Sequence, residues 1–138
     1  MKYFLTIIFI ACVFNLSAQT NTIQKDLNVG DYIFIKPCKK NAKEILSMDV
    51  YTRTTPYNKK KVNEKTGDGL FDEFFSDKSI EAKPLPCIMS GQRYKVASLQ
   101  EFNVNGQYKR VVLCYTGHHL TIIWIEFDQA LMKNEISF

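Results

Sequence analysis

The feature that most restricts the fold is the pair Asn105-Gly106, which lies between two strand-like runs in the last third of the chain. Residues 93–104 and 107–115 flank it, and Asn-Gly accepts the positive φ angles of a two-residue type I′ turn. We therefore expect a β-hairpin. Residues 120–127 are apolar at successive positions, which is typical of a central strand buried on both faces, and we expect Trp124 within them to be buried. The succession of these three strand-like runs along the chain predicts an antiparallel meander.

Two further strands are expected earlier in the chain. Residues 32–36 are β-branched and aromatic and stop at Pro37, and residues 49–55 have strand composition and stop at Pro56. Residues 41–46 can form one or two helical turns between them. The whole pattern predicts an all-β, mainly antiparallel fold with roughly five to seven strands, a small twisted barrel or sandwich comparable in size to SH3-like barrels.

A polar loop and two short helices complete the expected architecture. Residues 57–69 are polar and have no apolar periodicity, which indicates an exposed loop. The apolar positions of residues 70–75 share one helical face, so a short amphipathic helix is expected to anchor this loop to the core. Asp128 is expected to cap a short C-terminal helix over residues 129–134.

The first eighteen residues have the composition of a cleaved export signal. Lys2 gives a positive start, residues 3–16 are almost entirely apolar, and small and polar residues follow around Ala18. This apolar run is shorter than the roughly 20 residues that cross a membrane. Lipidation of Cys12 is an alternative that leaves very little apolar sequence before the cysteine. We therefore expect residues 19–138 to form a single β domain without a transmembrane segment, periplasmic or secreted in a bacterial envelope.

Three cysteines remain after removal of this signal, and an oxidising compartment allows two of them to pair. Cys114 lies inside the apolar run of residues 111–115, where a free thiol behaves as a small buried hydrophobe. Cys38 and Cys87 each follow a proline, at the ends of elements where the backbone can be positioned for a bridge. We expect Cys38 to pair with Cys87, and other pairings stay open on sequence alone.

Charge is strongly segregated along the chain. Residues 36–65 hold nine basic and three acidic side chains, a balance of +6, and residues 68–81 reverse the sign with five acidic side chains against Lys78. The basic segment with its interleaved tyrosines predicts a surface for an anionic partner. The candidate binding residues are Lys39, Lys40, Lys43, Tyr51, Arg53, Tyr57, Lys59, Lys60 and Lys61. The alternative is a solubilising loop that is neutralised by the acidic segment that follows it.

The chain carries no motif for catalysis or for a cofactor. His118 and His119 are the only histidines, and the two fall short of the three or four ligands of a zinc site, so they are expected to lie in a turn. Glu101, Glu126 and Asp128 are candidates for the carboxylate pair of a glycoside hydrolase, although strand edges and a helix cap also account for them. We therefore expect no catalytic residue, no metal and no cofactor.

A short element, Ser90-Gly91-Gln92-Arg93-Tyr94, has the pattern Ser-Gly-x-x-Tyr. It resembles an element of the membrane-bound and periplasmic inhibitors of c-type lysozyme. Tyr115-Thr116-Gly117 resembles their second element, without the lysine that precedes its glycine. The resemblance implies a small exported β-protein that inhibits another protein. The same residues also fit a turn followed by a strand that begins at Tyr94.

These features favour an exported, non-catalytic binding protein of the inhibitor or immunity type, which neutralises an acidic protein partner in the cell envelope. The first alternative is an envelope accessory module that binds glycan or lipid headgroups through Tyr51, Tyr57 and the lysines. The second alternative is a small metal-dependent hydrolase. Nucleic acid is not expected as a partner, because the compartment is wrong and the chain has only three arginines and no nucleic-acid-binding motif.

Overall fold

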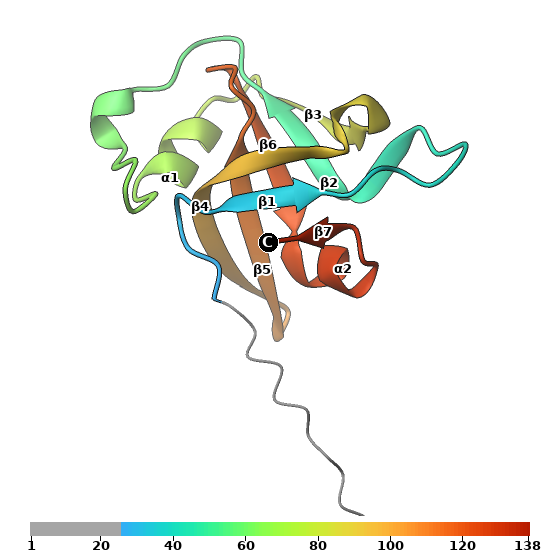
Figure 1. The fold of residues 1–138 in the computed structure, drawn as a ribbon. Coiled ribbons are helices and arrows are strands. Elements are labelled where there is room, and N and C mark those ends of the chain that lie inside the picture. The colour runs from blue at the N-terminus through green and yellow to red at the C-terminus, as the bar shows by residue number, and fades with distance from the viewer. Residues whose placement is uncertain (1–25) are drawn as a thin grey trace, which may run out of the picture.

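The computed structural model describes residues 26–138, so the expected export signal, with Cys12, lies outside the described residues. Seven antiparallel strands form one curled sheet in the order β3-β2-β6-β5-β4-β1-β7 (Figure 1). The strands are β1 (Tyr32–Ile35), β2 (Glu44–Thr52), β3 (Glu81–Pro86), β4 (Gln92–Val104), β5 (Gln107–Tyr115), β6 (Thr121–Glu126) and β7 (Ile136–Ser137). The prediction of a small all-β, barrel-like fold is confirmed.

Two α-helices and two short 3-10 helices connect the strands. Helix α1 (Leu70–Phe75) lies between β2 and β3 in sequence, and α2 (Phe127–Met132) follows β6 directly. The 3-10 helices are η1 (Lys59–Lys61), in the loop before α1, and η2 (Cys87–Met89), between β3 and β4. Within residues 26–138, no helix has the length and the apolar composition that a membrane crossing requires.

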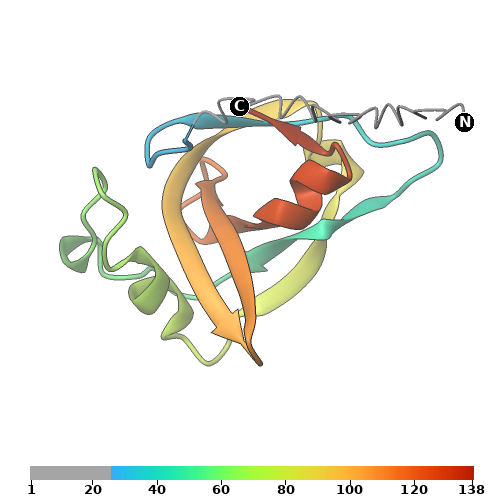
Figure 2. The same cartoon turned by 90° about the horizontal axis from the view of Figure 1, so that it is seen from below.

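Strand β4 is the long element that curls the sheet. Its first residues, 92–95, pair with β1, whereas residues 96–104 pair with β5. The register shifts between Val96 and Ser98, and such a bulge bends a strand and increases its twist. Figure 2 looks into the resulting half-barrel, in which β4 forms a curved wall and α2 lies on the concave side.

The expected meander is confirmed at its turn and at its central strand. Asn105 and Gly106 have φ angles of 52° and 77°, as the type I′ turn requires. Strand β6 lies between β2 and β5, and its successive residues Ile122 and Ile123 belong to two different apolar clusters. This explains why its sequence is apolar at successive positions.

The two clusters lie on opposite faces of the sheet. The concave core joins the inward side chains of the strands to α2, through Phe127 and Ala130. The convex core lies under α1, whose Leu70 and Phe74 are buried against β5 and β6. The predicted amphipathic helix over residues 70–75 is therefore confirmed, and it anchors the polar loop before it to the outer face of the sheet.

Three local expectations are corrected. Residues 41–46 are not helical, because Asn41 takes a left-handed φ of 67° and β2 already begins at Glu44. Helix α2 begins at Phe127 rather than Gln129, and the Asp128 side chain binds Arg110 instead of capping the helix. Trp124 is only half-buried, because it lies on the convex face where the rings of α1 cover it in part.

Gly67 and Gly69 position the polar loop against the sheet. Gly67 has φ +78°, and a Cβ at this residue would lie 2.5 Å from the Ala97 carbonyl oxygen at the β4 bulge. A Cβ at Gly69 would likewise collide with the Lys61 carbonyl oxygen. These contacts are too short for any side chain, so the loop backbone packs where only glycine fits.

We expect Gly67→Ala to lower the free energy of unfolding by on the order of 1 to 3 kcal/mol, because both the positive φ and the backbone contact become unfavourable. Urea denaturation followed by circular dichroism measures the change. Gly30→Ala is the matched control, since Gly30 has φ +93° but no atom within 4 Å of the added Cβ. An equal decrease in the free energy of unfolding of the two variants would contradict the role assigned to the contact with the Ala97 carbonyl.

Candidate binding surface

The fold separates the predicted basic segment into two sites. Lys39, Lys40 and Lys43 lie in the loop between β1 and β2, whereas Lys59, Lys60 and Lys61 form η1. Figure 1 shows these two loops projecting on opposite sides of the sheet. The segment is therefore not one continuous basic face, and each group of lysines has its own surroundings.

The lysines of η1 lie beside acidic side chains. Lys61 forms a salt bridge of 3.5 Å with Glu73 of α1. The shallow depression next to η1 is lined by Lys60, Lys61 and Lys65 but also by Glu64 and Asp68. This arrangement agrees with the alternative in which the acidic segment neutralises the lysine run.

Arg53 is not part of an exposed face, and this expectation is corrected. Its side chain is only 7% exposed. The guanidinium donates to the carbonyl oxygens of Glu73 and Phe74 at the end of α1, and to that of Thr55 at 2.8 Å. It also lies 3.7 Å from the Asp77 carboxylate. Arg53 therefore fixes α1 to the end of β2.

The two tyrosines of the predicted surface belong to the convex core. The Tyr51 ring lies 5.1 Å from that of Phe75 and 5.6 Å from that of Trp124, between ring centroids. Tyr57 packs edge-on against Phe74 at 5.9 Å. Burial raises the pKa of both phenols above the usual range. Both tyrosines are half-buried and support α1.

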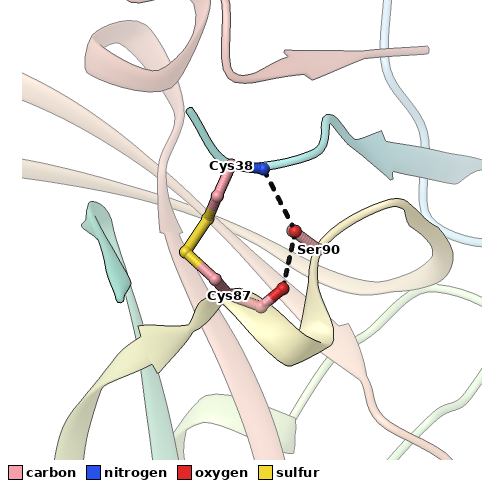
Figure 3. The surroundings of a disulfide bond; sticks show 3 residues. All are labelled: Cys38, Cys87 and Ser90. Carbon is pink, nitrogen blue, oxygen red and sulfur yellow. Dashed lines mark hydrogen bonds between the residues drawn. A yellow bond between two sulfur atoms is a disulfide. The ribbon is translucent and has the colours of Figure 1, made fainter. Parts of the chain in front are cut away.

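The predicted disulfide joins the loop after β1 to η2. Cys38 and Cys87 are bridged, with their Cα atoms 5.7 Å apart. Figure 3 shows Ser90 beside the bridge, where its hydroxyl donates to the Cys87 carbonyl at 2.7 Å and accepts from the Cys38 N–H at 3.2 Å. The Cys87 N–H in turn donates to the Lys43 carbonyl at 3.0 Å. Bridge and hydrogen bonds together hold the loop against η2.

Cys114 is the free cysteine of the described chain, as expected, and it is fully buried in the concave core. Burial raises the pKa of its thiol to about 12. At neutral pH the thiol therefore stays protonated and unreactive.

Three large apolar side chains are exposed at this disulfide end of the sheet. Leu46 is 75% exposed, Ile88 is 85% exposed and Met132 is 79% exposed. Leu46 and Lys133, the neighbour of Met132, line one groove of about 250 Å³. Cys38 lines the same groove, and Ile88 directly follows Cys87, the residue to which Cys38 is bridged. Leu46 therefore lines the groove itself, whereas Ile88 and Met132 adjoin it only as chain neighbours of Cys87 and Lys133.

Lysines line and adjoin the groove next to the disulfide. Lys36, Lys39 and Lys133 line the groove together with the acidic Glu44 and Glu135, and Lys40 and Lys43 lie in the adjoining loop. Within the part of the chain that the structure describes, no salt bridge involves Lys39, Lys40 or Lys43. We define the disulfide-end surface as Leu46, Ile88, Met132, Lys39, Lys40, Lys43 and Lys133. It has an apolar centre and a basic rim.

The histidines lie where the sequence placed them, in an exposed turn. The rings of His118 and His119 stack at 5.0 Å between centroids, and the Nδ1 atom of His118 lies 3.1 Å from the Thr121 hydroxyl. Among residues 26–138 there is no group of three or more histidine, cysteine, aspartate or glutamate side chains placed to hold a metal ion.

Two of the three acidic candidates, Glu126 and Asp128, are engaged with basic or aromatic partners, whereas Glu101 forms no salt bridge among residues 26–138. Glu126 accepts from the Trp124 indole N–H at 3.2 Å and lies 3.5 Å from the Lys109 ammonium. Asp128 accepts from Arg110, and this hydrogen bond is the main reason why the pKa of Asp128 lies below its usual range. Both carboxylates are held in ion pairs, which favours the structural interpretation of these residues.

The element that resembles lysozyme inhibitors has a structural role here. The Ser90 hydroxyl is occupied by the contacts beside the disulfide, and the buried Tyr94 donates its hydroxyl to the Met89 carbonyl at 2.6 Å. Gly91 provides the positive φ, +72°, that connects η2 to β4. A turn followed by a strand accounts for these residues, with β4 beginning at Gln92.

Sequence reasoning did not find the apolar centre of the disulfide-end surface, because no pattern marks Leu46, Ile88 or Met132 as exposed. Comparison with known proteins adds nothing to this description: no protein-family model, no curated protein and no solved structure shows significant similarity to the chain.

Proposed function

We propose that this chain is an exported, non-catalytic binding protein, of the inhibitor or immunity type, that captures an acidic protein partner through the disulfide-end surface. The observation that carries the proposal is the exposure of three large apolar side chains, each at least 75%, on elements that adjoin the disulfide groove and its lysines. The disulfide supports the proposal of export, because such bonds persist in oxidising compartments.

The anatomy of the surface supports a protein partner. Apolar side chains that gather at one exposed site are typical of protein interfaces, which combine an apolar centre with a polar rim. Leu46, Ile88 and Met132 come from β2, η2 and α2, so the centre is formed by three separate elements. The Cys38–Cys87 bridge holds η2 against the β1–β2 loop, which carries Lys39, Lys40 and Lys43, before binding, and this reduces the entropy lost when a partner docks.

The charge of the rim supports an acidic partner. Lys39, Lys40 and Lys43 take part in none of the salt bridges found among residues 26–138, so their charges are available to a partner. Exposed charges of this kind accelerate diffusional encounter more than they slow dissociation. The lysines are therefore assigned to steering and the apolar side chains to the lifetime of the complex.

The test is a pair of matched charge reversals. The variant Lys39→Glu/Lys40→Glu/Lys43→Glu changes the disulfide-end surface, and Lys59→Glu/Lys60→Glu/Lys61→Glu changes η1 by the same charge. We expect a specific acidic protein to be recovered from an envelope extract by the wild-type chain. Its association rate should fall about tenfold or more with the first variant, and the salt dependence should weaken. The second variant should bind almost as the wild type does.

Three outcomes would contradict the proposal. The first is recovery of no specific protein at low salt. The second is an equal effect of the two triple variants, or a larger effect of the η1 variant, which would return recognition to Lys59, Lys60 and Lys61. The third is binding to anionic lipid vesicles or glycans in place of a protein. Thermal unfolding of each variant near the wild-type midpoint confirms that folding is unchanged, since exposed charges contribute little to stability.

A further inference from the structure

A second cavity lies at the other end of the concave face, away from the disulfide. It has a volume of about 240 Å³ and opens between the β4–β5 pair, helix α2 and the two ends of the described chain. Its apolar lining residues are Leu27, Leu99, Val111, Val112, Phe127 and Phe138. We call this cavity the mouth pocket.

The floor of the mouth pocket is apolar and open to solvent. Leu99 and Val112 face one another across the β4–β5 ladder. The rings of Phe127 and Phe138 form the opposite wall, with their centroids 5.7 Å apart. Leu99 is 41% exposed and Phe138 is 37% exposed, so the pocket offers apolar surface that a ligand can cover. Mouths of β-barrels are common positions for small-molecule sites.

Among the described residues that line the pocket, Arg110 is the only basic one, and it is already paired. Arg110 stacks over the Phe127 ring, with its guanidinium carbon 4.9 Å from the ring centroid. Its Nε atom donates to both carboxylate oxygens of Asp128, at 3.1 and 3.3 Å. This fork neutralises the charge of Arg110 locally and fixes its guanidinium as part of the wall.

Two other carboxylates line the pocket, and one of them, Glu101, accepts a hydrogen bond from the Tyr108 hydroxyl. Asp26 and Glu101 are both exposed, and neither takes part in a salt bridge with any residue between 26 and 138. Glu101 lies directly across from Arg110 in the β4–β5 ladder. The Arg110 guanidinium nevertheless donates its hydrogen bonds to Asp128. The pocket therefore combines an apolar floor with an excess of negative charge at its rim.

We propose that the mouth pocket binds small organic ammonium ions, with the apolar part of the ligand on the floor and its cationic group at Asp26 and Glu101. A volume of about 240 Å³ lies below the range of about 300 to 1,000 Å³ that is usual for drug-sized ligands, so a short alkyl chain or a single ring is the size that fits. This site is independent of the disulfide-end surface and of the function proposed for it.

The test compares three probes that share one alkyl chain. Hexylammonium, hexanol and hexanoate are titrated separately into the folded chain, and the methyl NMR signals of Leu99 and Val112 are followed. We expect all shifts to concentrate on the mouth pocket. Hexylammonium should bind about tenfold more tightly than hexanol, since one charge-assisted contact is gained, and hexanoate should bind more weakly than either.

Glu101→Gln supplies the matched variant, because Glu101 is exposed and we expect its replacement to leave the fold unchanged. We expect it to reduce the affinity for hexylammonium several-fold and to leave that for hexanol unchanged. Glu81→Gln, on the edge strand β3, is the control and should change neither affinity.

The proposal is overturned if hexanoate binds as tightly as hexylammonium, if Glu101→Gln has no effect, or if none of the probes shifts the pocket signals at millimolar concentration. Each result leaves the proposed function untouched, because Leu46, Ile88 and Met132 are not involved in the titration.

Discussion

Replacing both Cys38 and Cys87 by serine is expected to lower the free energy of unfolding by about 4 kcal/mol, and to abolish partner binding. The bridge closes a sequence separation of 49 residues that includes β2, α1 and β3. Loss of the cross-link gives the unfolded chain back the entropy of this long loop. In the folded chain the β1–β2 loop and η2 then depend only on the Ser90 and Lys43 hydrogen bonds.

Urea denaturation at low temperature measures the stability loss, and the pull-down described above measures the loss of binding. Cys114→Ala is the control, because Cys114 is buried in the concave core and forms no bridge. Thiol labelling adds a direct check: the chain without residues 1–18 should show one reactive thiol, Cys114, and only after unfolding. A double variant as stable as the wild type, or one that still binds the partner fully, would contradict the role assigned to the bridge.

The predictable part of the fold is the part in which local sequence and tertiary packing agree. Asn105-Gly106 encodes its turn in its own backbone preferences, so the β4–β5 hairpin follows from two residues and their flanks. Residues 70–75 encode their helix because four apolar side chains need one common face. The pairing of Cys38 with Cys87 was favoured because Cys114 lies in an apolar run, and the structure confirms it, although the sequence alone left other pairings open.

Strand β3 was not predicted, because Pro84 and Pro86 argue against a strand. Both prolines are compatible with the observed position, since β3 is an edge strand that pairs with β2 alone and needs no donors on its outer side. Its only buried residue is Leu85. An edge strand with one inward side chain leaves no periodicity to detect, and the same holds for the two residues of β7.

The candidate binding surface was predictable only in part. The charge run identified Lys39, Lys40 and Lys43, but composition alone gave no means to separate them from Lys59, Lys60 and Lys61. Their separation follows from the curl of the sheet, which places the β1–β2 loop and η1 on opposite sides. Leu46 is exposed beside the buried Ile45, near the irregularity where the β2–β3 register shifts. Such a bulge depends on strand pairing, which the sequence of β2 does not show.

Arg53 gives the sharpest contrast between sequence pattern and structure, because a residue chosen for its exposed charge is a buried support of α1. We expect Arg53→Met to lower the free energy of unfolding by on the order of 3 kcal/mol, because carbonyl oxygens at the end of α1 lose a charged hydrogen-bond donor. Methionine fills a volume similar to that of arginine, so the decrease in the free energy of unfolding reflects the lost hydrogen bonds. The carbonyls of Glu73 and Phe74 lose their donor, and Asp77 loses its ion pair.

The same variant should also change the surroundings of Trp124, and this separates a local effect from a general one. Phe71 and Phe75 of α1 pack against the Trp124 ring at 6.2 and 5.7 Å, so loosening α1 exposes the indole. We expect a red shift of its fluorescence while the far-ultraviolet circular dichroism of the sheet is retained. Arg53→Lys keeps the charge, but one ammonium group cannot reach all the acceptors. Its free energy of unfolding should therefore lie between those of the wild type and Arg53→Met. An Arg53→Met variant with wild-type stability and unchanged fluorescence, but with lost partner binding, would return Arg53 to the recognition surface.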